Sequence, residues 1–358
     1  MLRTRSVIVA TGSHLPAVVV PNSRFLEHEF LDTRGQKINK STAEIIEQFE
    51  SITGIRERRY AADDQVTSDI ATLAARDALE SSGIDPERLD SIIVAHNFGN
   101  VKHGSRRSDL VPALAARVKA GLRIRNPGTV AVDLIFGCPG WVQGVIHSDA
   151  MIRTGDIRLA MVIGADTLSR VSDPHDRDSL IYADGAGAVI LEARDTEDEV
   201  GILSHCSRSD TLEHSGMLFM GHSYNDEAFL ESLFLKMEGR KLYKYALNTV
   251  AGAIKDALDK AGVGLEEVSK VLLHQANGKM DEAILNALYS LWGLEPPPGV
   301  MPMTISWLGN SSVATVPTLL DLIVKGRMEG QAIASGDHVV FASVGAGMNI
   351  NAVVYRVP

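Results

Sequence analysis

The sequence predicts an α/β fold made of two similar, pseudo-symmetric halves, and two internal matches carry this prediction. RDALESSGIDPERLDSIIV at 76–94 resembles KDALDKAGVGLEEVSKVLL at 255–273. GDIRLAMVIGAD at 155–166 resembles GDHVVFASVGAG at 336–347, at nearly the same offset along the chain. Matched blocks in the same order and at a nearly fixed spacing indicate an internal duplication.

Each copy of the first block predicts a helix, a turn and a strand. Gly83 and Gly262 follow the two helix patterns, at the position after a helix end where glycine is favoured. The apolar runs that come next, at 91–97 and 270–273, lack polar alternation, which is typical of parallel strands buried on both faces. The second block predicts, in each half, a Gly-Asp turn that leads into another buried strand.

The boundary between the halves is expected after the strand pattern GAGAVILEA at 185–193. We therefore expect one half at residues 1–195 and the other at residues 196–358. A chain of 358 residues is too long for one ordinary single core and long enough for two packed units.

The composition describes a soluble globular protein and excludes several classes of function. Hydrophobic residues make up 45% of the chain, charged residues 22%, and the formal net charge is -10. Nucleic-acid binding is not expected, because it requires a basic surface. The first apolar run is shorter than the roughly 7 to 15 residues of a signal-peptide core, and no run approaches the ~18 residues of a membrane span. We expect a cytoplasmic protein that does not bind membranes.

The cysteines and glycine motifs predict neither a metal nor a cofactor. Cys138 and Cys206 are too far apart for a metal-binding pair and too few for a disulfide framework. Glycine-rich sequences at 185 and 345 lack the last glycine of a dinucleotide-binding fingerprint, and no phosphate-binding loop motif is present. Three further histidines lie without the spacing of zinc ligands: His96, His103 and His147.

Three polar residues are predicted to meet in one cleft. An apolar run ends at Gly137 and Cys138, and Pro139 is expected at the first position of the helix that follows. In the second half, Asn310 follows a run that we interpret as a strand, and His274 ends another strand. Because the carboxyl ends of strands in parallel α/β sheets meet at the edge that binds ligands, we expect these three polar side chains to lie together.

These residue types suit nucleophilic chemistry on a thioester. A cysteine at a helix N-terminus faces free N–H groups and the helix dipole, which favour the thiolate and can hold an oxyanion. His274 and Asn310 can donate hydrogen bonds without carrying a charge, as an enolate beside a thioester carbonyl requires. Each residue also has an ordinary structural explanation, as a buried thiol, a structural histidine or an asparagine turn. Their joint placement by the duplication favours the catalytic interpretation.

Six motifs spread along almost the whole chain carry a resemblance to a known family. They are GSHLPAVVVPN at 12–22, TGIRERR at 53–59, SRVSDPHDRDSLIYADGAGAVIL at 169–191, HQAN at 274–277, GNSS at 309–312 and GAGM at 345–348. Together they resemble the 3-oxoacyl-acyl carrier protein synthase III group of the thiolase superfamily. The resemblance implies a duplicated thiolase-like fold with layered αβαβα architecture, and a homodimer.

The resemblance also implies roles for particular residues. It implies Cys138 as the acylated nucleophile, with His274 and Asn310 hydrogen-bonding the thioester carbonyl of the second substrate. It implies an oxyanion hole made by the backbone N–H groups of Cys138 and Gly347. In the implied reaction, an acyl group moves from an acyl carrier protein or coenzyme A thioester to the cysteine. A second thioester, usually malonyl, then loses carbon dioxide, and its carbanion attacks the acyl-enzyme to give a 3-oxoacyl thioester.

Departures from the family pattern predict a specialised substrate. Gln48 and Ile52 stand where relatives that use coenzyme A primers carry a tryptophan and an arginine beside the adenine. The segment 101–126 is longer than in the housekeeping enzymes, and we expect it near the acyl tunnel and the dimer contact. These departures favour a condensing enzyme for longer or 3-oxo acyl chains, of the dialkylresorcinol- and cyclohexanedione-forming branch or of a quinolone-type branch.

Basic residues predict docking of an acidic carrier protein. Lys279 stands where the family usually has an arginine five residues after the catalytic histidine, and it keeps the positive charge. The densest basic cluster of the chain predicts a further docking patch, although a solvated helix face explains it equally well: Lys236, Arg240, Lys241 and Lys244.

Three other functions stay open on the sequence alone. A housekeeping fatty-acid initiation synthase would use the same residues on an acetyl group. An acyl transferase or thioester hydrolase would pass the acyl group to an amine, an alcohol or water. A non-catalytic partner subunit would keep the fold alone, but such subunits tend to lose the nucleophile or the histidine, and this chain keeps both.

Overall fold

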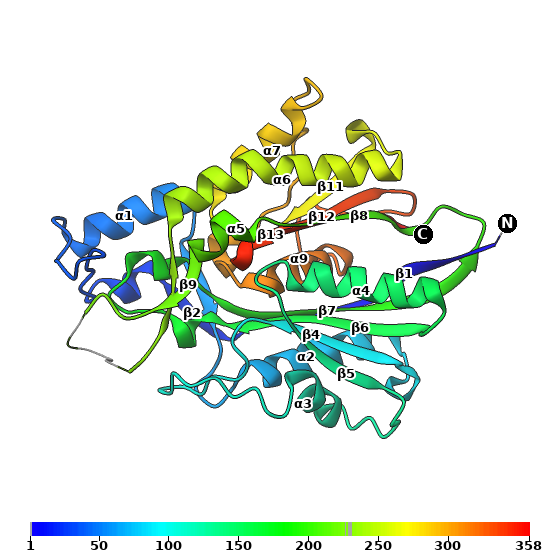
Figure 1. Ribbon diagram of the computed structural model, residues 1–358, viewed down its shortest axis with the longest axis horizontal. Coiled ribbons are helices and arrows are strands. Elements are labelled where there is room, and N and C mark those ends of the chain that lie inside the picture. Colours follow the sequence, from blue (N-terminus) through cyan, green and yellow to red (C-terminus); the bar gives the residue numbers. More distant parts are fainter. Residues whose placement is uncertain (1, 226, 228–230) are drawn as a thin grey trace.

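The computed structural model describes residues 2–225, 227 and 231–358, and it contains two stacked β-sheets with helices outside and between them (Figure 1). The first sheet has the strand order β1-β7-β6-β4-β5. Strand β4 pairs in parallel with β5 and β6, whereas β7 runs antiparallel to β1 and β6. Its strands are β1 (Arg3–His14), β4 (Ser91–His96), β5 (Val130–Ile135), β6 (Leu159–Thr167) and β7 (Asp184–Thr196).

The second sheet has the strand order β11-β12-β13-β8. Strands β11 and β12 are parallel, and the other pairs are antiparallel. Its strands are β8 (Gly201–Ser209), β11 (Val268–Leu273), β12 (His338–Gly345) and β13 (Asn349–Arg356). Two small antiparallel pairs lie outside these sheets: β2 (Val18–Pro21) with β3 (Glu57–Tyr60), and β9 (Leu218–Gly221) with β10 (Phe234–Met237).

Two helices form the middle layer, α4 (Gly140–Thr154) and α9 (Thr315–Val324) (Figure 1). Trp141 of α4 and Leu319 of α9 belong to one buried cluster with Val162 of the first sheet and Phe341 of the second. Helices α2 (Thr67–Ser82) and α3 (Leu114–Gly121) cover the outer face of the first sheet, while α6 (Gly239–Ala261) and α7 (Gly278–Ser290) cover that of the second. The predicted αβαβα layering is therefore confirmed. The remaining α-helices are α1 (Thr42–Thr53), α5 (Thr211–His214) and α8 (Ile305–Leu308).

The two halves repeat the elements that the duplicated blocks predict. Helices α2 and α6 end at Gly83 and Gly262, which both cap the helix in the left-handed conformation. The buried strands β4 and β11 follow them, each after one 3-10 turn. The strands of the first sheet lie within 3–196 and those of the second within 201–356. The division of the chain into units at 1–195 and 196–358 stays a prediction.

Two local expectations are wrong. The run before Asn310 forms the short helix α8 rather than a strand. Pro139 precedes α4 as its N-cap instead of occupying the first helical position, because the helix begins at Gly140. Over the described ranges, none of the helices combines the length and the apolar character needed to cross a bilayer. The same residues include no group of three or more His, Cys, Asp or Glu side chains placed to hold a metal ion.

Candidate active site

Cys138, His274 and Asn310 line one cavity of about 380 Å³ at the carboxyl ends of β5 and β11. The structure thus brings together the three residues that the sequence placed in one cleft. The wall of the cavity is otherwise mostly apolar: Phe98, Ile135, Phe136, Leu168, Ile181, Leu218, Phe219, Met220, Leu235, Met237, Leu242, Met280 and Val344. Such a site has few polar groups, and they converge on one point, which is typical of a small-molecule pocket.

Glycines allow the loop of Cys138 to touch a loop of the second half. Gly137 has φ 73°, and a methyl group on it would lie 2.8 Å from the backbone nitrogen of Ala346. A methyl group on Gly345 would lie 2.5 Å from the backbone nitrogen of Cys138. Both positions therefore require glycine for this close approach. The contact fixes Cys138 against the turn between β12 and β13.

The Cys138 thiol is half-buried beside the Ser312 hydroxyl. Burial raises its pKa to about 11, although a hydrogen bond from the Ser312 hydroxyl acts in the opposite direction. Desolvation of the charged form thus opposes the effect expected of a helix N-terminus, which favours the thiolate. The thiol lies in the turn just before α4, and it has to give up its proton when it reacts.

His274 is a buried, neutral imidazole. It follows β11, and its backbone N–H donates to the carbonyl of Ala342 at 2.9 Å. Burial lowers the pKa of His274 to about 4, and a hydrogen bond with the backbone of Ser312 raises it only partly. The next residue, Gln275, holds the loop: its amide donates to Pro302 O and accepts from the backbone of Thr304. A neutral imidazole held in this way can donate a hydrogen bond to a substrate without adding charge.

Asn310 is fixed by backbone pairing with the first half of the chain. Its N–H donates to Ile181 O at 2.9 Å, and its carbonyl accepts from Ala183 N at 2.9 Å. Its side-chain Oδ1 accepts from Ser312 N at 2.9 Å. Because the oxygen accepts this bond, the group that the amide offers to a ligand is its NH₂ donor. The preceding Gly309 has φ 68°, as this tight turn requires.

Gly347 lines the same cavity as Cys138, in the turn between β12 and β13. It has φ 78°, and Asn349 Nδ2 fixes the turn by donating to Ala346 O at 2.8 Å. Both proposed donors of the oxyanion hole therefore reach one cavity, while their joint role stays a prediction.

Ser312 and Asn97 also line the cavity, with Asp166 behind them, and the sequence patterns predicted none of these three residues as part of the site. Ser312 ends the motif GNSS, and Asp166 ends the strand pattern GDIRLAMVIGAD, so both lay inside quoted segments. Neither motif shows which polar side chains face the thiol. The long segment 101–126 was expected near the acyl tunnel, but none of its residues lines the 380 Å³ cavity. Its residues Gly104 and Arg106 instead border a separate cavity beside β2 and β3.

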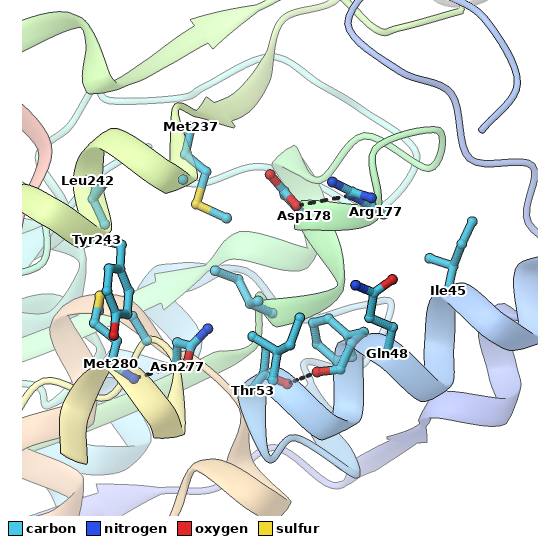
Figure 2. Close-up of a pocket in the computed structure, with 15 residues that line it drawn as sticks. Ile45, Gln48, Thr53, Arg177, Asp178, Met237, Leu242, Tyr243, Asn277 and Met280 are labelled. Atoms are coloured by element: carbon cyan, nitrogen blue, oxygen red, sulfur yellow. Dashed lines mark hydrogen bonds and ion pairs between the residues drawn. The ribbon is translucent and has the colours of Figure 1, made fainter. Parts of the chain in front are cut away.

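A second cavity of about 230 Å³, whose lining is drawn in Figure 2, adjoins the first and is called the entrance below. The two share part of their lining: Ile181, Met237, Leu242, Ala276 and Met280. Gln48 and Ile52 of α1 line this entrance, and so do Arg177, Asp178 and Tyr243. Arg177 Nε lies 3.7 Å from Asp178 Oδ1. Burial and the neighbouring Asp176 raise the pKa of Asp178 to about 6.

The structure separates the basic residues that were grouped as a docking patch. Lys236 is buried, and its ammonium group lies 2.6 Å from Asp173 and 3.1 Å from Asp176. It therefore cannot dock a partner, and this part of the expectation is wrong. Lys241 is exposed but pairs with Glu238 at 2.7 Å. The other members are exposed near the ends of α6 and α7 that border the entrance: Arg240, Lys244 and Lys279.

Comparisons with known proteins agree with this geometry. Residues 132–211 match the model of 3-oxoacyl-[acyl-carrier-protein] synthase III, and residues 258–357 match that of its C-terminal region. The chain is 30% identical to the solved 3-oxoacyl-[acyl-carrier-protein] synthase III of Aquifex aeolicus, with 99% of each chain covered and a TM-score of 0.78. For the corresponding enzyme of Pseudomonas aeruginosa the identity is 28%, the coverage 99% and 98%, and the TM-score 0.79. A priming β-ketosynthase from a polyketide pathway is 25% identical, with coverage of 99% and 97% and a TM-score of 0.81.

Proposed function

Since the chain belongs to the 3-oxoacyl-[acyl-carrier-protein] synthase III family of condensing enzymes, we propose that it joins two acyl thioesters by Claisen condensation on Cys138. One observation carries the proposal: a single apolar cavity holds a half-buried thiol, a neutral imidazole and an asparagine amide. A nucleophile beside two uncharged donors suits a reaction that passes through an acyl-enzyme and an enolate.

In the first half-reaction, the sulfur of Cys138 attacks the carbonyl carbon of a donor thioester. The S–H proton leaves, a new carbon–sulfur bond forms, and the bond to the donor sulfur breaks. The negative charge of the tetrahedral intermediate lies on the former carbonyl oxygen. We assign its stabilisation to the backbone N–H groups of Cys138 and Gly347, whose turns meet at Gly345.

In the second half-reaction, the enolate of another thioester attacks the acyl carbon on Cys138. His274 and Asn310 hydrogen-bond the enolate oxygen in this proposal. A neutral His274 suits the role because its pKa of about 4 keeps it uncharged at physiological pH. Formation of the enolate by loss of carbon dioxide from a malonyl-type thioester follows the resemblance described above.

The lining of the cavity supports a longer acyl chain than acetyl. Leucine, methionine and phenylalanine side chains surround the thiol, and the volume of about 380 Å³ accommodates an extended apolar chain. The proposed substrates are therefore medium-length or 3-oxo acyl groups, as in the dialkylresorcinol- and cyclohexanedione-forming branch. A housekeeping role in fatty-acid initiation is the alternative, supported by the relative that is 30% identical over 99% of its length.

The entrance supports an acyl carrier protein as donor over coenzyme A. Gln48 and Ile52 supply neither a large aromatic face nor a positive charge. Asp178 adds a carboxyl group beside Arg177. A nucleotide carrying several phosphates is poorly matched to this lining, whereas Arg240 and Lys279 beside the entrance suit an acidic protein.

Homodimer formation through β5 is part of the proposal. This strand is one of the two edge strands of the first sheet, and its Val130, Val132 and Ile135 are 59%, 44% and 59% exposed. An apolar sheet edge is a template for pairing with a second copy. Sedimentation of the wild type and of Val130→Lys tests it, with a monomer expected for the variant only.

Intact-protein mass spectrometry tests the proposed reaction. Wild type, Cys138→Ala and the matched control Cys206→Ala are incubated with acyl-coenzyme A and acyl-carrier-protein thioesters of different chain lengths. We expect a mass increase of one acyl group in the wild type and in Cys206→Ala, largest with medium or 3-oxo chains on the carrier protein. Addition of a malonyl or 3-oxoacyl thioester should then release a 3-oxo or cyclic diketone product.

Other outcomes assign other functions. Acylation by acetyl groups alone would support fatty-acid initiation. Release of free acid, ester or amide without a new carbon–carbon bond would support a hydrolase or acyl transferase. Acylation that persists in Cys138→Ala, or none with any donor, would refute Cys138 as the nucleophile and favour a non-catalytic subunit.

A further inference from the structure

Ser312 contacts all three of the proposed catalytic residues. Its hydroxyl lies 3.5 Å from Cys138 Sγ, and its N–H donates to Asn310 Oδ1 at 2.9 Å. Its backbone also forms a hydrogen bond with the imidazole of His274. The residue is 2% exposed and has φ 55°, a left-handed conformation that is uncommon outside glycine. Backbone strain of this kind is concentrated at functional sites.

Behind Ser312 lies a buried carboxyl group that the condensation scheme does not use. Asp166, near the end of β6, is 1% exposed. Its Oδ1 accepts from Asn97 N at 2.9 Å, and its Oδ2 accepts from Asn97 Nδ2 at 2.6 Å. The Ser312 hydroxyl forms a hydrogen bond with the same carboxylate and accepts one from Asn97 Nδ2 at 2.9 Å. A continuous chain of hydrogen bonds thus runs from the half-buried Cys138 thiol through Ser312 to the buried Asp166, and Asn97 holds it in place.

We propose that the Ser312 hydroxyl relays the proton of the Cys138 thiol to the Asp166 carboxylate, an inference that rests on the proposed role of Cys138 as nucleophile. As the sulfur attacks, the S–H proton passes to Ser312 Oγ and the Ser312 O–H proton passes to Asp166. The sulfur forms its bond to the acyl carbon, and the bond from that carbon to the donor sulfur breaks. The proton then returns from Asp166 through Ser312 to the departing thiolate.

The Ser312 hydroxyl has a single hydrogen, so it can donate to only one of its two neighbours, the thiol or the carboxylate, at a time. The hydroxyl lies within hydrogen-bond reach of both groups and can turn its hydrogen to either the sulfur or the carboxylate. For the transfer, it donates to the carboxylate and accepts from the thiol. After the transfer, it donates to the thiolate and accepts from the protonated carboxyl. Every hydrogen bond of the chain is kept with its direction reversed, so the buried groups stay satisfied throughout.

Burial favours a relay that stays inside the protein. It raises the pKa of the thiol to about 11 and also raises the pKa of Asp166, so this carboxyl can hold a proton more readily than an exposed one. The transfer moves one negative charge along the chain and creates no second charge. The other titratable groups that face the pair are His96 beside Asp166, and Tyr182 and His274 beside the thiol.

The pH profile of Cys138 alkylation by iodoacetamide tests the relay. A proton that moves only within the protein leaves the total number of bound protons unchanged, so the wild-type rate should be flat from about pH 7 to pH 9. A thiol that loses its proton to solvent instead reacts about tenfold faster for each pH unit below its pKa. In Asp166→Asn and Ser312→Ala, the alkylation rate should no longer be flat but should rise about tenfold for each pH unit. Both should slow alkylation at pH 7.5 by about 10- to 100-fold.

Ser311→Ala is the matched control. Ser311 is buried beside Ser312, but its hydroxyl lies 3.3 Å from that of Thr315 and not at the thiol, so the flat profile should remain. Circular dichroism confirms the fold of each variant before the rates are compared. Because two variants interrupt the chain at different points, one that fails to fold still leaves the other as a test.

Three results would overturn the relay. The charge of Asp166 raises the pKa of the thiol, so Asp166→Asn would speed alkylation if the carboxylate acted only as a nearby charge. A flat profile that survives Asp166→Asn but is lost in His274→Ala would make His274 the proton acceptor. A wild-type Cys138 that reacts with neither iodoacetamide nor any acyl thioester would refute the proposed function itself, and the relay with it.

Discussion

Replacement of Gly345 by alanine should disable the nucleophile without replacing any proposed catalytic residue. The added methyl group would lie 2.5 Å from Cys138 N, 2.7 Å from Pro139 Cδ and 2.9 Å from Cys138 Cβ. Ordinary contact needs 3.4 Å or more, so one of the two loops has to move by about 1 Å. The obstacles are backbone and ring atoms, which cannot rotate away as a flexible side chain can.

The size of the effect follows from this displacement. A shift of about 1 Å at reacting atoms can cost about 100-fold in rate, and overpacking of a buried contact destabilises by about 1–3 kcal/mol. Gly345→Ala should therefore lower the acylation rate of Cys138 by about 100-fold, measured by intact-protein mass over time. Urea unfolding should show the loss of stability at an unchanged slope.

Gly252→Ala is the matched control for this change. Gly252 lies exposed in α6, and a methyl group there meets nothing within 4 Å. The helix should gain up to about 1 kcal/mol from alanine, and the acylation rate should not change. A wild-type acylation rate in Gly345→Ala would show that the two loops do not need their close contact, and the argument from Gly345 would fail.

Three further predictions follow from the geometry. His274→Ala should lower the rate of condensation by about 100-fold while the rate of Cys138 acylation changes only a few-fold, because the lost hydrogen-bond donor acts in the second half-reaction. Equal losses of acylation, measured by protein mass, and of condensation, measured by product formation, would contradict this assignment. Because burial raises the pKa of Asp178 to about 6, the folded protein binds this proton more tightly than the unfolded chain. The contribution of Asp178 to the free energy of unfolding should therefore fall as pH rises from about 4 to 6. Asp178→Asn should reduce the pH dependence by this contribution, while Asp184, whose pKa burial also raises to about 6, keeps its own. Because the Asp178 side chain is 43% exposed, solvent screening limits this contribution to about 1 kcal/mol or less. Identical urea unfolding of wild type and Asp178→Asn at both pH 4 and pH 7 would refute the prediction. Lys236→Met leaves two buried carboxylates without their cation and should lower the free energy of unfolding by about 3–5 kcal/mol. Lys241→Met breaks an exposed pair and should lower it by less than about 1 kcal/mol. Similar losses for the two variants in urea unfolding would show that the buried ion pairs contribute no more to stability than the exposed one.

The sequence predicted the two similar α/β halves and the three central polar residues because these depend on patterns that repeat, whereas the layered arrangement came from the family resemblance. Continuous apolar runs next to glycine mark buried strands wherever they occur, and the second copy of each block supports the first. The interpretation of Cys138 and His274 needed only the rule that strand ends collect ligands. Asn310 was placed correctly although the element before it is a helix, since its position depends on pairing with Ile181 and Ala183.

Contacts between distant segments could not be predicted. Lys236 alternates with apolar neighbours, as an exposed lysine on an edge strand also would, and its partners lie about 60 residues earlier in the chain. Nothing in the local pattern shows that the lysine points inward. The chain from Cys138 to Asp166 through Ser312 likewise joins three separate segments, and one of them depends on a non-glycine residue with positive φ. Sequence patterns do not predict a positive φ at a non-glycine residue.

The middle layer has a consequence for how the chain folds. Helix α4 comes from the first half and α9 from the second, yet each packs on strands of both sheets. Either half alone would leave one apolar face of its central helix in water. The duplication therefore repeats a pattern without producing two independent folding units. The whole chain should unfold in one cooperative transition, with helix and tryptophan signals coinciding, and two separate transitions would show that the halves are autonomous.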